Sequence, residues 1–273
     1  FGSSSWLGTA TPSVPAPSTV ACHWHAFSYS STTGRMPSSL HERIRSDLLA
    51  HSSQYVPEFP RLILWCLDYN NWRAECVRLC LFSAGVPFDD RRVSYEELCT
   101  SGRLRFGTFP VLEVNGRIIA QPHAIATYVG KLTGFYPSDP WLASKVDEVL
   151  GGLTDATDLL ANTMQEKDLQ RKIHWRRSLI SEDGRLMVML AGVEDILSEN
   201  GLHGLCSGNE LSVADFAVWR AVGWISGSLD GIPYDYITRC FPRMWSLHQQ
   251  IDSLACVKEW KERHPHQYRL LPT

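Results

Sequence analysis

The chain has 273 residues, a length that suits two domains better than one. Its hydrophobic content of 44% and charged content of 20% are those of an ordinary globular protein, and the net charge of -3 argues against nucleic acid as a main partner, because nucleic-acid binding depends on a cationic surface. No segment approaches the roughly 20 apolar residues that cross a bilayer, so we expect no transmembrane segment.

Residues 1–59 read as an N-terminal extension. The first forty-one residues contain no Asp or Glu and a single basic residue, Arg35, among many Ser, Thr and Pro residues. This composition cannot build a hydrophobic core. It is typical of an organelle transit segment, which favours a mitochondrial location, with the cytoplasm as the alternative. Because such a segment is expected to lie on another surface, we predict that other protein subunits bind this extension.

The eight cysteines show neither paired Cys-x-x-Cys spacing nor the density of a disulfide-rich secreted domain. Most of them have apolar neighbours, which is typical of small core residues. The motif Cys22-His23-Trp24-His25 contains ligand types, but two complete ligand sets are not in view. We therefore expect no metal.

Residues 60–135 predict one compact α/β domain with a mixed sheet. The expected elements are strands over 61–67 and 86–93 separated by a helix over 71–84, then a hairpin over 109–119 and a helix over 122–132, with room for a helix before the hairpin. The Asn115-Gly116 pair is the strongest short-range hairpin signal. Pro122 suits the first position of a helix, where its missing N–H removes no helical hydrogen bond.

Residues 136–140 read as a linker, and residues 140–265 predict an all-helical domain. Helices are expected near 141–165, 168–198, 212–227, 241–253 and 256–263. The helix that begins after Ser212 is the clearest of them. Asp215 can reach back to the backbone of Ser212, a variant capping box with a structural role.

Four segments together resemble the glutathione transferases, nearest to the sigma and related tyrosine-type classes. They are Arg73-Ala74-Glu75 with the Val77-Arg78-Leu79 that follows, the run FGTFPVLEVNG at 106–116, the run QPHAIATY at 121–128, and the Ser212–Asp215 cap. The match covers about residues 60–265 in the order of the family. The resemblance implies a thioredoxin-like α/β N-terminal domain followed by an all-α C-terminal domain.

The resemblance also implies glutathione as substrate and several residues that contact it. Phe109 and Pro110, joined by a cis bond, would pair with its cysteinyl part, and Gln121 would contact the ligand or else satisfy local backbone. Tyr95 lies near a family residue that touches glutathione, and Arg73 is a candidate for a functional or interface ion pair. Where the family has Gln-Ser, this chain has Gln121-Pro122, which removes a hydroxyl and an N–H.

The family's thiol-activating tyrosine is also replaced. Depending on one inserted residue, Cys66 or Leu67 stands at its position, and neither carries a hydroxyl. The candidate catalytic residues are therefore Tyr69, two or three residues further on, and Cys66. Cys66 could form mixed disulfides, although a buried, inert thiol is the simpler interpretation. Trp72 replaces a family glycine and is expected to crowd the pocket.

Two functions follow from these residues. The first is a transferase fold with a degenerate glutathione site that serves as an accessory subunit of a larger, mitochondrial assembly. The second is an active glutathione transferase, working as a homodimer, that conjugates or isomerises small electrophiles with a rearranged donor. Fold alone cannot separate them, because one fold can host both enzymes and binding proteins.

Overall fold

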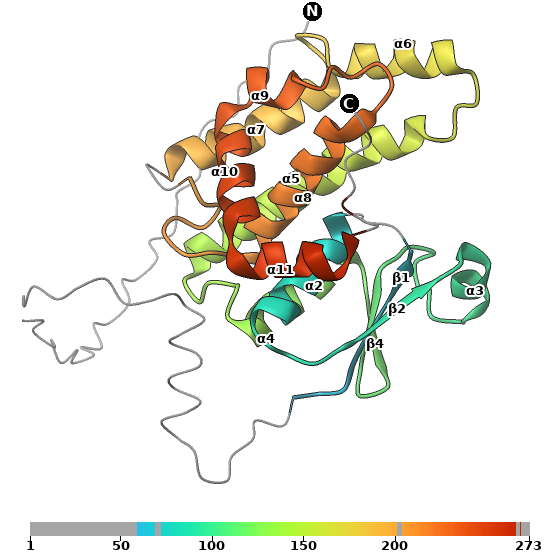
Figure 1. Ribbon diagram of the computed structural model, residues 1–273, viewed down its shortest axis with the longest axis vertical. Helices are drawn as coiled ribbons and strands as arrows, with labels where there is room; N and C mark the ends of the chain where they lie inside the picture. Colours follow the sequence, from blue (N-terminus) through green and yellow to red (C-terminus); the bar gives the residue numbers. More distant parts are fainter. Residues whose placement is uncertain (1–58, 69–71, 201–203, 266–267, 269–273) are drawn as a thin grey trace, which may run out of the picture. The chain divides into compact units, whose positions relative to one another are not determined.

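The computed structural model describes residues 59–68, 72–200, 204–265 and 268 (Figure 1). The predicted extension up to residue 58, with its Cys22–His25 motif, lies outside the described residues. Tyr69 also lies outside them. The elements are labelled as in Figure 1, and the first described strand is β1.

A four-stranded mixed sheet with the strand order β2-β1-β3-β4 forms the first part of the fold. The strands are β1 (Leu62–Leu67), β2 (Asp89–Val93), β3 (Val111–Val114) and β4 (Arg117–Ala120). β1 runs parallel to β2 and antiparallel to β3, and β3 and β4 form the predicted hairpin. Asn115 and Gly116 close that hairpin with φ angles of 49° and 80°, the left-handed conformation that these two residue types tolerate best.

The two faces of β1 have different partners because successive side chains of a strand point to opposite faces. Leu62 and Leu64 join the large core that includes α2 (Trp72–Ser83) and α4 (Pro122–Thr133). Ile63 and Trp65 pack with Leu98 of α3 (Tyr95–Thr100) in a smaller cluster. The predicted α/β domain is therefore confirmed, with helices on both faces of its sheet (Figure 1).

The remainder of the described chain is helical, as predicted. The helices are α5 (Pro140–Thr163), α6 (Leu169–Leu179), α7 (Arg185–Glu199), α8 (Val213–Ser228), α9 (Tyr236–Cys240), α10 (Pro242–Ser253) and α11 (Ala255–Arg263). The buried helix α8 packs against α2, α5 and α10, so it joins the sheet part to the helical part. Among the described residues, no helix is both long enough and apolar enough to cross a membrane.

The prediction of a single helix over 168–198 is wrong, because a turn separates α6 from α7. Gly184 caps the start of α7, and a Cβ atom at this position would lie 2.2 Å from the carbonyl oxygen of Leu179. The backbone N–H of Gly184 donates to the carbonyl of Ser181 at 2.8 Å. The close approach of backbone to backbone therefore requires glycine and ends the helical path. The short helix α9 was not predicted.

The capping box predicted at Ser212 is present. The Asp215 carboxylate accepts hydrogen bonds from the N–H groups of Ser212 and Cys206, both at 2.7 Å. Both Ser212 and Asp215 are fully buried. The box fixes the start of α8 and the loop before it, which is the structural role expected for it.

Candidate functional site

The sheet register brings the ends of three strands together at one end of the sheet. Cys66 pairs with Arg92 of β2, Trp65 pairs with Val111 of β3, and Val111 pairs with Ala120 of β4. Continued by one residue, the antiparallel register places Cys66 beside Pro110 and Pro110 beside Gln121. Helix α4 begins two residues after the end of β4, and α2 begins five residues after the end of β1. We call Cys66, Leu67, Phe109, Pro110 and Gln121 the sheet-end site.

Phe109 and Pro110 form the middle of the sheet-end site. The peptide bond between them is cis, as the resemblance implied. Pro110 is buried, and the half-buried Phe109 ring packs against the small cluster around Trp65 and Leu98. This packing, on one face of the sheet, fixes the start of β3 at the end of the sheet.

Gln121 precedes α4 in an unusual conformation. Its backbone has φ 77° and ψ 121°, and its exposed side chain makes no capping hydrogen bond. Backbone strain of this kind persists where surrounding structure imposes it and often marks binding sites. Pro122 is buried at the first helical position and has no N–H to offer. The next two N–H groups, of His123 and Ala124, have no partner within the helix because they lie in its first turn.

Cys66 and Leu67 point to opposite faces at the end of β1. Cys66 is fully buried, and burial raises the pKa of its thiol, although the nearby Arg78 guanidinium acts to lower it. Leu67 is half-buried beside the small cluster on the other face. A thiol that stays protonated is a poor nucleophile. This environment favours the buried, inert interpretation of Cys66.

We expect Cys99 to react fastest with a maleimide among the described cysteines, and Cys66 to stay unmodified in the folded protein. Cys99 is exposed on α3, whereas Cys66 is buried with a raised pKa. Labelling for increasing times, followed by peptide mass spectrometry, measures both rates. Modification of Cys66 as fast as that of Cys99 would contradict this account.

Tyr95 reaches the same end of the sheet but lies on the surface. It is the first residue of α3 and follows Val93, which pairs with Leu67. Its side chain is 64% exposed, and the nearby Cys99 thiol on the next turn raises the pKa of Tyr95. Tyr69, the other tyrosine proposed near this site, lies outside the described residues.

Trp72 and Arg73 tie the start of α2 to α5. The buried Trp72 indole donates from Nε1 to Thr157 Oγ1 at 2.9 Å. Arg73 forms an ion pair with Asp158. The bulky Trp72 therefore fills space between the two parts of the fold. The Arg73 ion pair joins α2 to α5, and a contact of Arg73 with glutathione stays a prediction.

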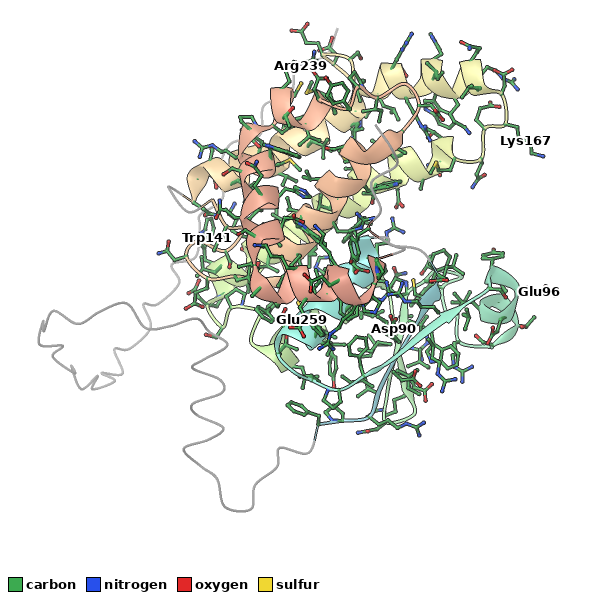
Figure 2. All side chains as sticks on the ribbon, in the orientation of Figure 1. Asp90, Glu96, Trp141, Lys167, Arg239 and Glu259 are labelled. Carbon is green, nitrogen blue, oxygen red and sulfur yellow. The ribbon has the colours of Figure 1, made fainter. Side chains whose placement is uncertain are left out.

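Behind the sheet-end site lies a buried polar network, for which the sequence analysis predicted no role. Glu75 and Arg78, both without exposed surface, pair at 3.0 Å on α2, and the Arg78 Nε also donates to Asp90 at 3.0 Å. Figure 2 labels Asp90 on β2. The Glu75 carboxylate further accepts from Trp260 Nε1 at 2.6 Å and from the hydroxyl of Tyr268. The sequence signal for this network was the pair of opposite charges at Glu75 and Arg78, which stand three residues apart among apolar neighbours.

His, Cys, Asp and Glu, the residue types that bind metal ions, all occur in the part of the chain that the structure describes. There, no group of three or more His, Cys, Asp or Glu side chains is arranged to hold an ion. The Asp147 carboxylate instead accepts a hydrogen bond from the Tyr136 hydroxyl at 2.8 Å and lies 2.9 Å from His123 Nε2. That cluster joins α4 to α5.

Comparisons with known proteins agree with this geometry. A profile of the glutathione S-transferase N-terminal domain matches residues 62–131. A glutathione S-transferase of Gallus gallus is 30% identical over 201 residues, which cover 71% of this chain and 86% of that protein. Glutathione S-transferase alpha-1 of Rattus norvegicus is 26% identical over 204 residues, 73% and 87% of the two chains.

Solved structures show the same fold. Prostaglandin synthase D of Nilaparvata lugens aligns with a TM-score of 0.63 and 25% identity, covering 78% of this chain and 100% of that one. The monomeric glutathione S-transferase Na-GST-3 of the hookworm Necator americanus aligns with a TM-score of 0.62 and 23% identity, covering 75% and 98%.

Proposed function

Because the chain belongs to the glutathione S-transferase family, we propose that it keeps the family fold, lacks the donors that activate glutathione, and serves as an accessory subunit of a larger assembly. The observation that carries this proposal is the identity of the residues at the sheet-end site. Cys66 places a buried thiol there, and Pro122 begins the adjoining helix α4 without an N–H.

The lost donors matter because of the chemistry they would perform. A hydrogen bond to a thiolate lowers the pKa of the thiol and so raises the concentration of the nucleophile. Leu67 and Cys66 provide no hydroxyl for that bond. Pro122 likewise provides neither hydroxyl nor N–H for a carboxylate at the start of α4. Weak binding and slow thiol chemistry are the expected consequences.

The accessory role and the location have separate support. The Ser-, Thr- and Pro-rich composition of residues 1–41, which lack acidic side chains, favours a mitochondrial destination and a partner surface for the extension. The homodimer is the alternative assembly. The accessory role is tested by comparing the sedimentation of the native protein in cell extract with that of the purified chain. If both sediment as a particle of the size of a homodimer, the accessory role is contradicted.

An active transferase is the second candidate, and two features favour it. The Phe109-Pro110 pair is present just before β3, and the exposed Gln121 side chain makes no capping hydrogen bond at the start of α4. In this version Tyr69 or Cys66 would act as the donor. The sigma-like assignment also stays a prediction.

Turnover separates the two candidates. We expect the 273-residue chain, given glutathione and a chlorinated dinitrobenzene, to show a rate indistinguishable from the uncatalysed reaction. A turnover near the enzyme median of about 10 per second would overturn the proposal. In that case Tyr69→Phe and Cys66→Ser, assayed singly, would identify the donor.

A further inference from the structure

A half-buried histidine, His248 of α10, lies where α10 packs against α8. Its ring stacks with two tryptophan rings. The ring centroids of His248 and Trp245, on the same helix, are 5.3 Å apart at an interplanar angle of 18°. The centroids of His248 and Trp219, on α8, are 6.1 Å apart at 14°. One imidazole therefore packs against aromatic rings from both helices.

The hydrogen bond of His248 fixes which ring nitrogen carries the hydrogen. Nδ1 of His248 lies 2.8 Å from the carbonyl oxygen of Trp219. Because a carbonyl oxygen only accepts, Nδ1 must donate, and the neutral ring keeps its free lone pair on Nε2. A proton that His248 gains therefore goes to Nε2 and leaves the bond to Trp219 in place.

The charged side chains around this ring do not favour an additional positive charge. Among the described residues, Arg220 of α8, Asp252 of α10 and Lys261 of α11 act on the imidazole. The Asp252 carboxylate already accepts from Lys261 Nζ at 2.8 Å and from Trp219 Nε1 at 3.1 Å. Because Asp252 is paired with one cation, it can compensate a second cation only in part.

Arg220 lies close to the imidazole. A Cβ atom placed on Gly223 would be 3.3 Å from Arg220 Nη1 and 3.3 Å from His248 Cε1. These two atoms are therefore at most about 7 Å apart. A like charge at this range disfavours the charged form of a titratable group, as burial also does. Protonated His248 would thus face a cation across the contact between α8 and α10.

We propose that His248 makes the contact between α8 and α10 sensitive to pH, so that mild acid loosens α10. The neutral imidazole stacks with the two tryptophans and donates to the Trp219 carbonyl. The protonated imidazole would face Arg220 and Lys261 while the Asp252 carboxylate is already engaged. The proposal is independent of the glutathione site.

The direction of the effect follows from the pKa of His248. Burial lowers this pKa below its ordinary value of 6.5, and Lys261 and Arg220 act in the same direction, against the Trp219 carbonyl and Asp252. The unfolded chain therefore binds the proton more tightly than the folded chain. Stability from this group is complete above about pH 6.5 and is lost as the pH falls below that value.

The titration of His248 is the first test, because stacking of a cation on indole rings acts in the opposite direction. Histidine hydrogen–deuterium exchange, followed by mass spectrometry of the 273-residue chain, measures the pKa of each imidazole without a substitution. We expect His248 to titrate below 6.5, the ordinary value. A pKa of 6.5 or higher for His248 would overturn the proposal.

Backbone hydrogen exchange of α10 tests the loosening, after correction for the intrinsic exchange rate at each pH. Between about pH 7.5 and pH 5.5, the fraction of open α10 should rise about three- to tenfold more in the unmodified protein than in His248→Gln. Gln offers an N–H to the Trp219 carbonyl but cannot gain a proton. His174→Gln, at an exposed position on α6, is the matched control and should keep the full rise. An equal rise in the unmodified protein and in His248→Gln would contradict the proposal.

Discussion

Replacing Glu75 with Gln should lower the free energy of unfolding by about 3–5 kcal/mol, the cost of breaking a buried ion pair by removing one partner. Glu75 has no exposed surface and accepts from Arg78, Trp260 and Tyr268. The substitution keeps the shape but removes the charge that faces Arg78. Urea denaturation at neutral pH measures the change.

The control for this variant is Glu96→Gln, which changes an exposed carboxylate on α3 (Figure 2). It should stay within about 0.5 kcal/mol of the unmodified protein. If Glu75→Gln had an equally small effect, the buried network would contribute little to the free energy of unfolding, contrary to the expectation from its burial.

Acid supplies a second readout of the same network. Burial acts to raise the pKa of Glu75, but Arg78 and the donors Tyr268 and Trp260 outweigh burial and lower it below its ordinary value of 4.5. Stability from this group is therefore present above about pH 4.5 and is lost as the pH falls below that value. Glu75→Gln should lack this part of the acid-dependent loss.

Replacing Trp72 with Ala should lower the free energy of unfolding by about 3–5 kcal/mol, the usual cost of removing a buried Trp. Trp72 is 4% exposed, and its removal leaves a cavity between α2 and α5 and takes a donor from Thr157. Thermal and urea unfolding measure the loss. Trp141→Ala, at a position 67% exposed, is the matched control and should be nearly neutral. Similar effects from both would contradict the burial described for Trp72.

The sheet and its hairpin were predictable because their signals are local. The apolar run of β1 and the Asn115-Gly116 turn carry their own conformational preferences. The break between α6 and α7 was not predictable in this way. Gly184 is required there by a contact with the Leu179 carbonyl, and such a contact exists only once the chain has folded.

The site was predictable in part for the same reason. The hairpin closed by Asn115-Gly116 sets the register that brings Pro110 and Gln121 to one end of the sheet, and their contacts with glutathione stay a prediction. It left Cys66 and Leu67 as alternatives, and strand alternation now assigns them to opposite faces. Of the buried network, only the Glu75–Arg78 pair could be read from the chain, because Asp90 and Tyr268 are brought to it by packing of α2, β2 and the segment after α11.

The central claim is that the donors for glutathione were lost at the sheet-end site, and calorimetric titration of reduced glutathione tests it most directly. The 273-residue chain should bind with a dissociation constant weaker than about 1 mM. Pro122→Ser restores an N–H and a hydroxyl at the start of α4 and should tighten binding about tenfold, since a hydrogen bond to a charged group contributes about 1.5–3 kcal/mol. Micromolar binding by the unmodified protein, left unchanged by Pro122→Ser, would contradict the account.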